Sequence, residues 1–527
     1  MRKHLLSTVL LMAFAATASA QWTEDANVNT RVTPSNLLFY EPNMLTNQDG
    51  TTYFFFVVPS HLDDGTDVFQ YRMQIYTPQG ERVFGAGGKI IAGERNITYT
   101  KFQDYITLDN EGNCIVSCYD LRDSAPDAYK FNYYIYKVNP AGDIVWGPVA
   151  LNGGQGDENT TGLSLCATDD GGTALAYTTS GKSDSQRVTN FERIDRDGNL
   201  LWKQPVVIEP EDVTQRPIVV NNGENEVMVL YQDAGGVYLA RAFDAEGNDV
   251  WGESVELYTG GFSSDRVYPC IDVQSGPDGG VVFSVMDGGY NGRFIYLTRE
   301  GEYAFPTANI GTVVEGPDYQ STVPSVYYDP DEQVFYVAFK NMAYYGYDGY
   351  GVNLQKFSLK GQRLWDDDGI VILPTEYAQQ VGGVFVRPAG KGRLAVIYHY
   401  MGSRSYNDPV GTYISVVDKD GNVLIEPNDV TTSEYTKNDL AVSPLIGGNH
   451  YIISWTEQRS NSSKECIFAQ YVNIDGTTRN GIAELTASPA GDTPRYFDLQ
   501  GRQLDGPLHK GINIVRMNGQ ARTIINK

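Results

Sequence analysis

The chain has 527 residues, and 65 Asp and Glu against 40 Lys and Arg give it a formal net charge of −25. Such a surface repels phosphate backbones, which excludes nucleic acid as a natural partner. The length is ample for one large domain or for several.

The first twenty residues are expected to be a signal peptide. Arg2 and Lys3 make the start basic, LLSTVLLMAFAA is a short apolar run, and Ala18-Ser19-Ala20 fits the cleavage pattern before Gln21. The apolar run is too short for a spanning helix, and no later segment is apolar for long enough. We therefore expect a protein without a membrane span that is secreted or lies at the outer cell surface.

From residue 25 onward the chain repeats one pattern. In RIDRDGNLLW a glycine, Gly198, has apolar Ile194 four residues before it and Trp202 four residues after it. Successive glycines of this kind are 62, 56, 49, 54, 60, 60 and 55 residues apart. The eight copies are centred on Gly80, Gly142, Gly198, Gly247, Gly301, Gly361, Gly421 and, in a degenerate form with Asn480 in the last place, Gly476.

The glycine of each copy is interpreted as part of a tight turn. Asp195, Asp197 and Asn199 alternate as calcium ligands do, but position 12 of such a loop would be Val206, where calcium loops need Glu. Most other copies lack the acidic pair. A hairpin turn explains the pattern, because glycine supplies the positive φ that tight hairpins need.

Each copy also contains a strongly apolar, β-rich run, from TTYFFFVV (51–58) to YIISWTE (451–457). Turn signals and a shorter apolar run precede most of these runs. Each copy therefore predicts a short strand, a turn, the long apolar strand, a loop, a third strand, the glycine turn and a fourth strand that carries the aromatic residue. Four strands per copy predict an all-β fold, an eight-bladed β-propeller with four-stranded blades over residues 25–486, followed by a small C-terminal β segment. A β-sandwich array, whose repeats are usually longer, and a seven-bladed ring with an additional sheet are the alternatives.

The aromatic residue of each turn is expected to fill the gap between neighbouring blades. Trp146, Trp202, Trp251 and Trp365 are therefore predicted to be core residues. Cys114 and Cys118 lie in one predicted strand, about 13 Å apart and too far for a disulfide. The cysteines are expected to be small buried residues.

Two sequence elements resemble known families. GDIVW, GNLLW, GNDVW and GQRLW resemble the Gly-x-x-x-Trp docking element of quinoprotein dehydrogenases, which are eight-bladed propellers. The Asp-x-x-Thr-Gly lead-in and the vicinal cysteine pair of that family are missing, so redox chemistry is not implied and no cofactor is predicted.

Residues 493–527 resemble the C-terminal sorting segment of proteins exported by the type IX secretion system of Bacteroidota. YFDLQGRQL, then KGINIV, then a basic β-branched end carry this resemblance, after a linker at 487–492. It implies contact with the secretion machinery, passage through the outer membrane and removal of the tail. An ordinary small β-domain is the alternative.

No catalytic or metal constellation is evident, because the five histidines lack metal-ligand spacing and no Gly-x-Ser-x-Gly elbow occurs. Loops between the second and third strands of a blade gather on one propeller face, and here they are rich in Asp, Asn, Gly and Tyr. Tyrosine gives rigid contact area with a polar tip. The candidate binding residues are Asp63, Asp64, Asp120, Asp123, Tyr290, Tyr344, Tyr345, Tyr347, Asp348, Tyr350 and Tyr406.

Three functions fit these observations. The first is a non-catalytic propeller that binds glycan or protein through these loops. The second is a hydrolase or lyase acting on polysaccharide, which would bring acids without a positive partner together at the channel. The third is a structural or assembly component of the cell envelope.

Overall fold

The computed structural model divides the chain into two compact units, Met1–Thr478 and Arg479–Lys527. In the first unit it describes residues 22, 26–34, 40–61, 67–93, 106–123, 131–151, 159–180, 187–208, 213–233, 237–258, 272–286, 292–306, 308–310, 322–342, 349–390, 392–403, 410–459 and 466–474. In the second unit it describes four strands.

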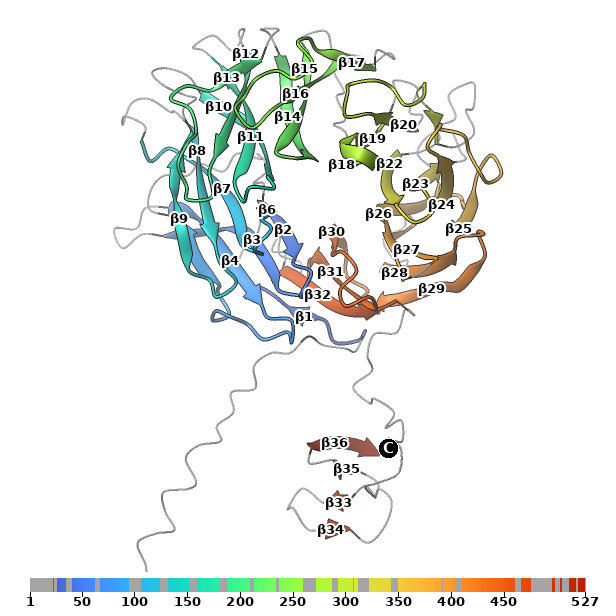
Figure 1. The fold of residues 1–527 in the computed structure, drawn as a ribbon. Coiled ribbons are helices and arrows are strands. Elements are labelled where there is room, and N and C mark those ends of the chain that lie inside the picture. Colours follow the sequence, from blue (N-terminus) through green and yellow to red (C-terminus); the bar gives the residue numbers. More distant parts are fainter. Residues whose placement is uncertain are drawn as a thin grey trace, which may run out of the picture. The chain divides into compact units, whose positions relative to one another are not determined.

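The first unit is an eight-bladed β-propeller, which confirms the predicted fold (Figure 1). Each blade is a four-stranded antiparallel sheet, and the eight sheets are arranged in a ring. Blade 1 consists of β2 (Tyr40–Thr46), β3 (Thr52–His61), β4 (Asp67–Tyr76) and β5 (Lys89–Ala92), and blade 2 of β6 (Ile106–Leu108), β7 (Cys114–Asp120), β8 (Asn132–Val138) and β9 (Ile144–Ala150). Blade 3 consists of β10 (Asn159–Ala167), β11 (Thr173–Ser180), β12 (Arg187–Ile194) and β13 (Val206–Ile208), and blade 4 of β14 (Val213–Gly223), β15 (Glu226–Asp233), β16 (Tyr238–Phe243) and β17 (Val255–Tyr258).

The second half of the ring repeats this arrangement, with one short 3-10 turn, η1 (Pro277–Gly279), in blade 5. Blade 5 consists of β18 (Asp272–Ser275), β19 (Val281–Met286), β20 (Gly292–Leu297) and β21 (Ala308–Asn309), and blade 6 of β22 (Thr322–Asp329), β23 (Val334–Met342), β24 (Tyr350–Ser358) and β25 (Ile370–Leu373). Blade 7 consists of β26 (Gln379–Pro388), β27 (Arg393–Ser403), β28 (Gly411–Asp418) and β29 (Val423–Thr431), and blade 8 of β30 (Lys437–Val442), β31 (His450–Glu457), β32 (Cys466–Asn473) and β1 (Thr30–Arg31).

Blade 8 takes its fourth strand from the start of the chain. β1 pairs with β32 through Thr30 opposite Ala469, so the two ends of the propeller meet in one sheet (Figure 1). The repeat pattern predicts that the degenerate copy at Gly476 supplies the fourth strand of the last blade; Gly476 and Asn480 lie outside the described residues. Their copy lacks the aromatic residue, which is consistent with a blade completed from elsewhere.

The glycine turns connect each blade to its neighbour. Gly142 has φ of +86°, and a Cβ atom there would lie 2.0 Å from Cζ of Phe84 in the preceding blade, so only glycine fits. The same contact joins Trp146 to Gly198, Trp202 to Gly247, Trp251 to Gly301, Phe305 to Gly361, and Trp365 with Ile370 to Gly421. The predicted position of the tryptophans between blades is confirmed, but they are half-buried and lie toward the outer edge of the core.

The turn in RIDRDGNLLW is closed by its own side chains. Oδ1 of Asp195 accepts hydrogen bonds from the backbone N–H groups of Asp197 (2.9 Å) and Asn199 (2.8 Å). These bonds lower the pKa of Asp195 although its partial burial acts in the opposite direction. The carboxylate is therefore engaged by the turn backbone, as the turn interpretation predicts.

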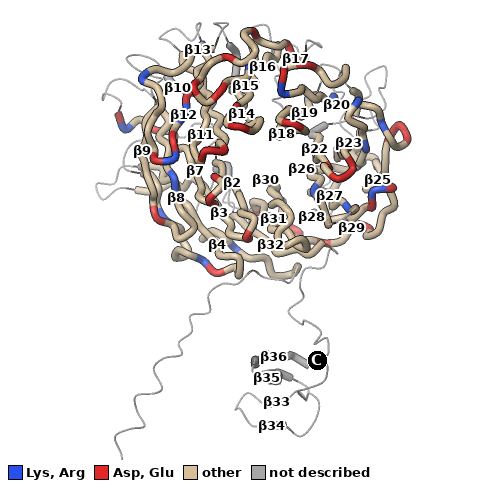
Figure 2. Tube along the Cα trace, viewed as in Figure 1, with Lys and Arg blue, Asp and Glu red and all other residues tan. Residues whose placement is uncertain are grey.

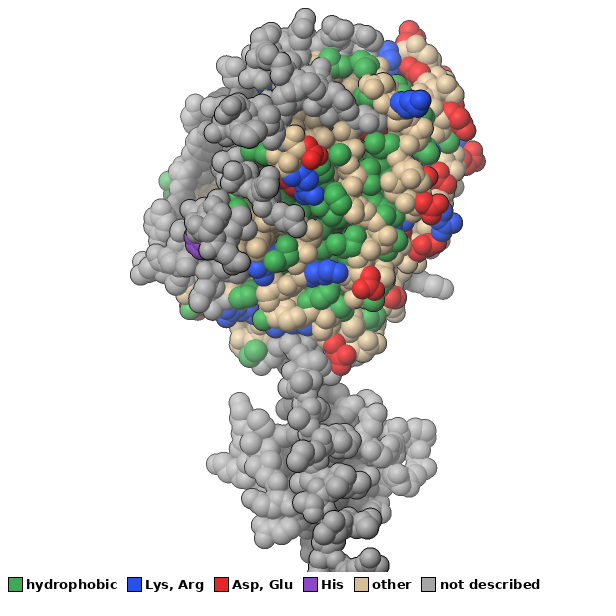
Figure 3. Space-filling view, turned by 90° about the vertical axis from the view of Figure 1, so that its left-hand side faces the viewer, with side chains coloured by type: hydrophobic (Ala, Val, Ile, Leu, Met, Phe, Trp, Pro, Cys, Tyr) green, Lys and Arg blue, Asp and Glu red, His purple; other side chains and the backbone are tan. Residues whose placement is uncertain are grey.

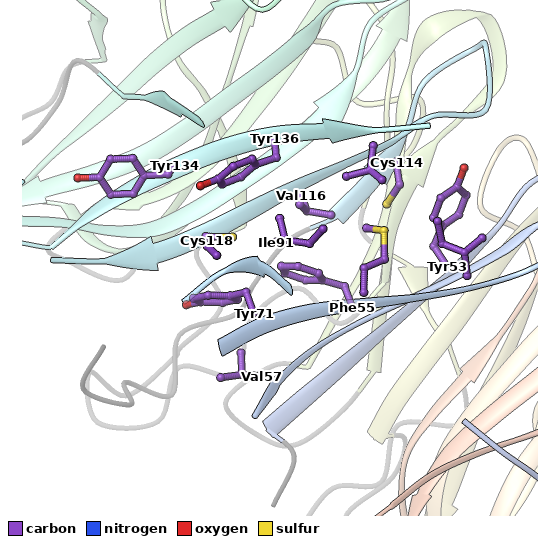
Figure 4. Close-up of a cluster of buried hydrophobic side chains, with 14 residues drawn as sticks. Tyr53, Phe55, Val57, Tyr71, Ile91, Cys114, Val116, Cys118, Tyr134 and Tyr136 are labelled. Atoms are coloured by element: carbon purple, nitrogen blue, oxygen red, sulfur yellow. The ribbon is translucent and has the colours of Figure 1, made fainter. Parts of the chain in front are cut away.

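Among the described residues, the core forms eight hydrophobic clusters, one for each contact between neighbouring blades. The cluster between blades 1 and 2 contains Phe55, Tyr71, Val116 and the buried thiols of Cys114 and Cys118 (Figure 4). The second strand of every blade is apolar on both faces because a sheet covers it on each side. Burial of Cys114 and Cys118 without a disulfide matches the prediction.

The second unit is a small β-sheet, as predicted. Its strands are β33 (Arg495–Phe497), β34 (Gln503–Leu504), β35 (Gly511–Met517) and β36 (Gln520–Asn526), in the order β34-β33-β35-β36. The predicted boundary at residue 486 and the linker at 487–492 lie outside the described residues. Within the described part of the chain, no helix is long and apolar enough to cross a membrane.

Candidate functional site

The antiparallel blades give the propeller two different faces. One face, here called the turn face, carries the turns between first and second strands and between third and fourth strands. The other, the loop face, carries the loops between second and third strands and the connections from one blade to the next. The described parts of the loop face are mainly the strand ends at 120–123 and 457–459 and the connections at 374–378 and 432–436.

Three of the predicted binding residues lie within the described residues, namely Asp120, Asp123 and Tyr350. Asp120 and Asp123 belong to blade 2, whereas Tyr350 begins β24 in blade 6, so the fold does not bring Tyr350 to the two acids. Eight others lie outside the described residues, and their role stays a prediction: Asp63, Asp64, Tyr290, Tyr344, Tyr345, Tyr347, Asp348 and Tyr406.

Asp120, at the end of β7, is engaged by Arg122. Nε of Arg122 donates to Oδ1 (2.9 Å) and Oδ2 (3.1 Å) of Asp120, and Nη2 donates to Oδ2 as well. The side chain of Asp120 is only 4% exposed. Its carboxylate is therefore the partner of a fixed arginine and has little surface for a ligand.

Two tyrosines, Tyr134 and Tyr136, also contact Arg122. Its Cζ lies 4.0 Å from the ring centroid of Tyr134, and Nη1 donates to the hydroxyl of Tyr136 (2.7 Å). Although burial lowers the pKa of Arg122, bonding to Asp120 outweighs burial and raises it above its ordinary value. Asp123 accepts a hydrogen bond from the Tyr134 hydroxyl (2.8 Å). This cluster fastens the end of blade 2.

Blade 8 repeats this arrangement with different residues. Glu457, at the end of β31, has a fully buried side chain that accepts bonds from Nε of Arg459 (3.0 Å) and Nε1 of Trp455 (3.0 Å). Ser433 donates a third bond to it. Cζ of Arg459 lies 3.9 Å from the ring centroid of Phe468. Phe468 is four residues before Val472, as Tyr134 is four residues before Val138, so the two rings hold equivalent places.

Two exposed tyrosines lie on consecutive blade connections. Tyr377 follows β25 in the stretch Thr-Glu-Tyr and is 72% exposed, and Tyr435 follows β29 in Ser-Glu-Tyr and is 47% exposed. The ring of Tyr435 lies 5.7 Å from Cζ of Arg459. Arg459 is therefore close to the rings of both Phe468 and Tyr435.

The connections that carry these tyrosines are held by side chains from the first strand of the next blade. Gln379, at the start of β26, donates to the carbonyl oxygen of Pro374 (2.8 Å). Lys437, at the start of β30, donates to the carbonyl oxygen of Tyr435 (2.9 Å) and to that of Ser433. Burial lowers the pKa of Lys437 to about 8. The connections are thus fixed before any ligand arrives.

Tyr350 has a separate environment in blade 6. Its ring lies 5.3 Å from Nζ of Lys340, and its carbonyl oxygen accepts a bond from Nε2 of Gln379 (2.5 Å). Burial lowers the pKa of Lys340 to about 8. Through Gln379, Tyr350 supports the connection at 374–378.

Sequence reasoning missed Arg459, Tyr377 and Tyr435. A signal for the arginine was present, because YDLRD and TEQRS place an acid and an arginine two residues apart at the end of the second strand. For the tyrosines the signal was the recurrence of Thr-Glu-Tyr and Ser-Glu-Tyr before a first strand. Binding residues were predicted only in the loops between second and third strands. The two tyrosines lie on the connections between blades, which occupy the same face as those loops.

No known family model matches the chain, and no curated protein matches its sequence. Among solved structures, a polysaccharide lyase of family PL25, an ulvan lyase, is similar over 87% of this chain and 97% of its own, with 11% identity and a TM-score of 0.45. The BP39L lectin from Burkholderia pseudomallei is similar over 70% and 96%, with 12% identity and a TM-score of 0.44. The α-L-arabinofuranosidase Arb93A from Fusarium graminearum is similar over 61% and 93%, with 14% identity and a TM-score of 0.33.

Proposed function

We propose that the protein is a secreted or cell-surface β-propeller that binds glycans through its loop face without transforming them. The observation that carries this proposal is the pair of exposed rings, Tyr377 and Tyr435, on two consecutive connections that are fixed by Gln379 and Lys437. A rigid, exposed ring with a polar tip offers a flat apolar face to a sugar ring and a hydroxyl to its substituents. Because the connections are already ordered, little conformational entropy is lost on binding.

Three acids at strand ends on the described loop face support binding without catalysis, whereas Glu376 and Glu434 on the blade connections are exposed. Glycoside hydrolysis needs two carboxyl groups that flank the bond to be cleaved, one of them free to give up or accept a proton. Asp120 and Glu457 are each bonded to an arginine, and Asp123 accepts a bond from Tyr134. The carboxylates of Asp120 and Glu457 are therefore occupied by partners from the blade, and one oxygen of the exposed Asp123 is bonded as well.

Replacing both exposed tyrosines should abolish most of the binding. We expect Tyr377→Ala with Tyr435→Ala to weaken the affinity for the tightest-binding polysaccharide at least about tenfold, which corresponds to ~1.4 kcal/mol. The measurement is a titration of the mature chain with polysaccharides found on a glycan array. Tyr303→Ala is the matched control, because Tyr303 is 39% exposed and follows a turn of blade 5 on the other face. Equal affinities of the double variant and the native chain would refute the proposal.

The proposed location outside the cell rests on the sequence of the two ends. The signal peptide at 1–20 and the sorting segment at 493–527 would together direct the chain through both membranes of a bacterium with type IX secretion. We expect residues 487–527, fused to a periplasmic reporter, to move the reporter to the medium or the cell surface. A reporter carrying the same residues in scrambled order should stay in the periplasm. Retention of both reporters would contradict this part of the proposal.

A further inference from the structure

Arg459 differs from its counterpart Arg122 in what its terminal nitrogens contact. In blade 2, Nη1 of Arg122 donates to Tyr136 and Nη2 to Asp120. In blade 8, Nε of Arg459 donates to Glu457, and no hydrogen bond or ion pair to Nη1 or Nη2 is found within the described residues. The side chain of Arg459 is 43% exposed, compared with 27% for Arg122. One arrangement is therefore closed by the blade itself and the other is open to solvent.

The sequence explains why the second arrangement is open. Tyr136 is two residues before Val138 in β8, and the equivalent place in β32, two residues before Val472, belongs to Gln470. A tyrosine hydroxyl at this place reaches Nη1 of the arginine in blade 2, whereas Gln470 is shorter and its side chain is buried. The Arg459 side chain is therefore partly exposed at the end of β31.

The guanidinium of Arg459 is nevertheless held in place. Its Nε is bonded to a fully buried carboxylate, and its Cζ lies 3.9 Å from the ring centroid of Phe468 and 5.7 Å from that of Tyr435. A guanidinium offers paired N–H groups in a planar fork that matches the two oxygens of a carboxylate. Because the fork is fixed in advance, little freedom is lost when a carboxylate binds.

Two positive charges, those of Arg459 and the buried Lys437, lie beside the connection at 432–436, which also carries the exposed Glu434. Glu457 is already bonded by Arg459, Trp455 and Ser433, and the buried Lys437 adds a positive charge beneath the connection. Exposed acids such as Glu81 also lie on the turn face, and Figure 3 shows acidic side chains along one edge of the propeller. Acidic residues are spread over the whole ring (Figure 2).

We infer that the loop face selects acidic glycans, with a uronic acid carboxylate bound by Nη1 and Nη2 of Arg459 and its sugar ring against Tyr435. This inference rests on the proposed function and adds the chemical class of the glycan. It makes Arg459 the residue that determines specificity, whereas Tyr377 and Tyr435 supply contact area for any sugar.

The test compares two forms of one polymer, polygalacturonate and its methyl ester, which differ only in the charge of the carboxyl group. We expect the mature chain to bind the acid form at least about tenfold more tightly at low salt, a difference typical of a charge-assisted bidentate contact. Arg459→Gln should reduce the affinity for the acid form to that for the ester and leave the ester unchanged. Arg459→Lys, which keeps the charge and loses the fork, should lie between the two.

Arg122→Gln is the matched control, because it removes an equivalent stacked arginine whose terminal nitrogens are occupied. It should leave both affinities unchanged, and thermal unfolding of each variant shows whether the propeller remains folded. Equal affinity of the native chain for acid and ester, or equal losses in Arg459→Gln and Arg122→Gln, would overturn the inference. Binding confined to neutral glycans would overturn it and leave the proposed function standing, whereas no glycan binding at all would overturn both.

Discussion

Replacing Asp109 by alanine should lower the free energy of unfolding by about 3–5 kcal/mol, the usual result of removing one partner of a buried ion pair. Asp109 lies in the turn after β6, and its Oδ2 is 2.7 Å from Nζ of Lys137 in β8. Their side chains are 0% and 4% exposed. The loss is large because the charge of Lys137 would stay buried without its carboxylate.

Asp109 also holds its own turn together. Oδ1 accepts bonds from the backbone N–H groups of Glu111 (3.0 Å) and Asn113 (2.8 Å), and Oδ2 accepts one from the Asn113 side chain (2.9 Å). Chemical denaturation, followed by tryptophan fluorescence, measures the effect. Asp197→Ala, at an exposed position of another turn, should change stability by less than about 0.5 kcal/mol.

The effect of Asp109 depends on pH in a defined direction. Burial alone would raise the pKa of Asp109, but hydrogen bonds from Lys137 and Asn113 outweigh burial and lower it. A lowered pKa means that the contribution to stability is fully present above the unfolded pKa of about 3.9 and is lost as the pH falls through the folded pKa. The difference between the native chain and Asp109→Ala should therefore shrink below about pH 4. A constant difference from pH 7 to pH 3 would contradict this account.

Replacing Trp22 by alanine should destabilise the propeller by about 3–5 kcal/mol, the range for truncating a buried tryptophan. Trp22 is 6% exposed, and its ring stacks on Tyr76 of blade 1 with centroids 4.5 Å apart. Its backbone nitrogen would lie 2.3 Å from a Cβ atom on Gly80. Trp22 thus takes the place at the Gly80 turn that the aromatic residue of the preceding blade takes at other turns.

This prediction tests how the ring closes. Trp22 precedes β1, so its contact with blade 1 and the pairing of β1 with β32 together join blade 8 to blade 1. Thermal unfolding monitored by circular dichroism measures the loss. Val28→Ala is the control in the same segment, since Val28 is 55% exposed and should contribute little. A loss no larger for Trp22→Ala than for Val28→Ala would show that the segment does not close the ring.

Most of the fold was predicted from the repeat pattern. Glycine turns such as that at Gly198 and the apolar second strands recur at blade-sized intervals, and this local pattern is enough to predict four-stranded blades. Ring closure could not be predicted in this way, because the pairing of Thr30 with Ala469 joins the two ends of the sequence. The start of the fourth strand was also missed: in blade 3 the chain makes a single bridge between Ile194 and Leu200 before β13 begins at Val206.

The candidate site was less predictable than the fold, because the chemistry of each residue depends on which neighbouring side chains bond to it. Asp120 was predicted to bind a ligand, but Arg122 reaches its carboxylate from two residues away. Conversely, Arg459 is open because residue 470 is glutamine where blade 2 has Tyr136. Which side chain contacts Arg122 or Arg459 becomes clear only when the register of the strands is known.

Hydrogen–deuterium exchange on the mature chain, with and without a bound oligosaccharide, tests most directly the claim that a closed propeller binds glycans through its loop face. The account predicts slower exchange of the backbone amides in the connections at 374–378 and 432–436 when the oligosaccharide is bound. Slower exchange confined to the turns at 109–113 and 168–172, on the turn face, would contradict it.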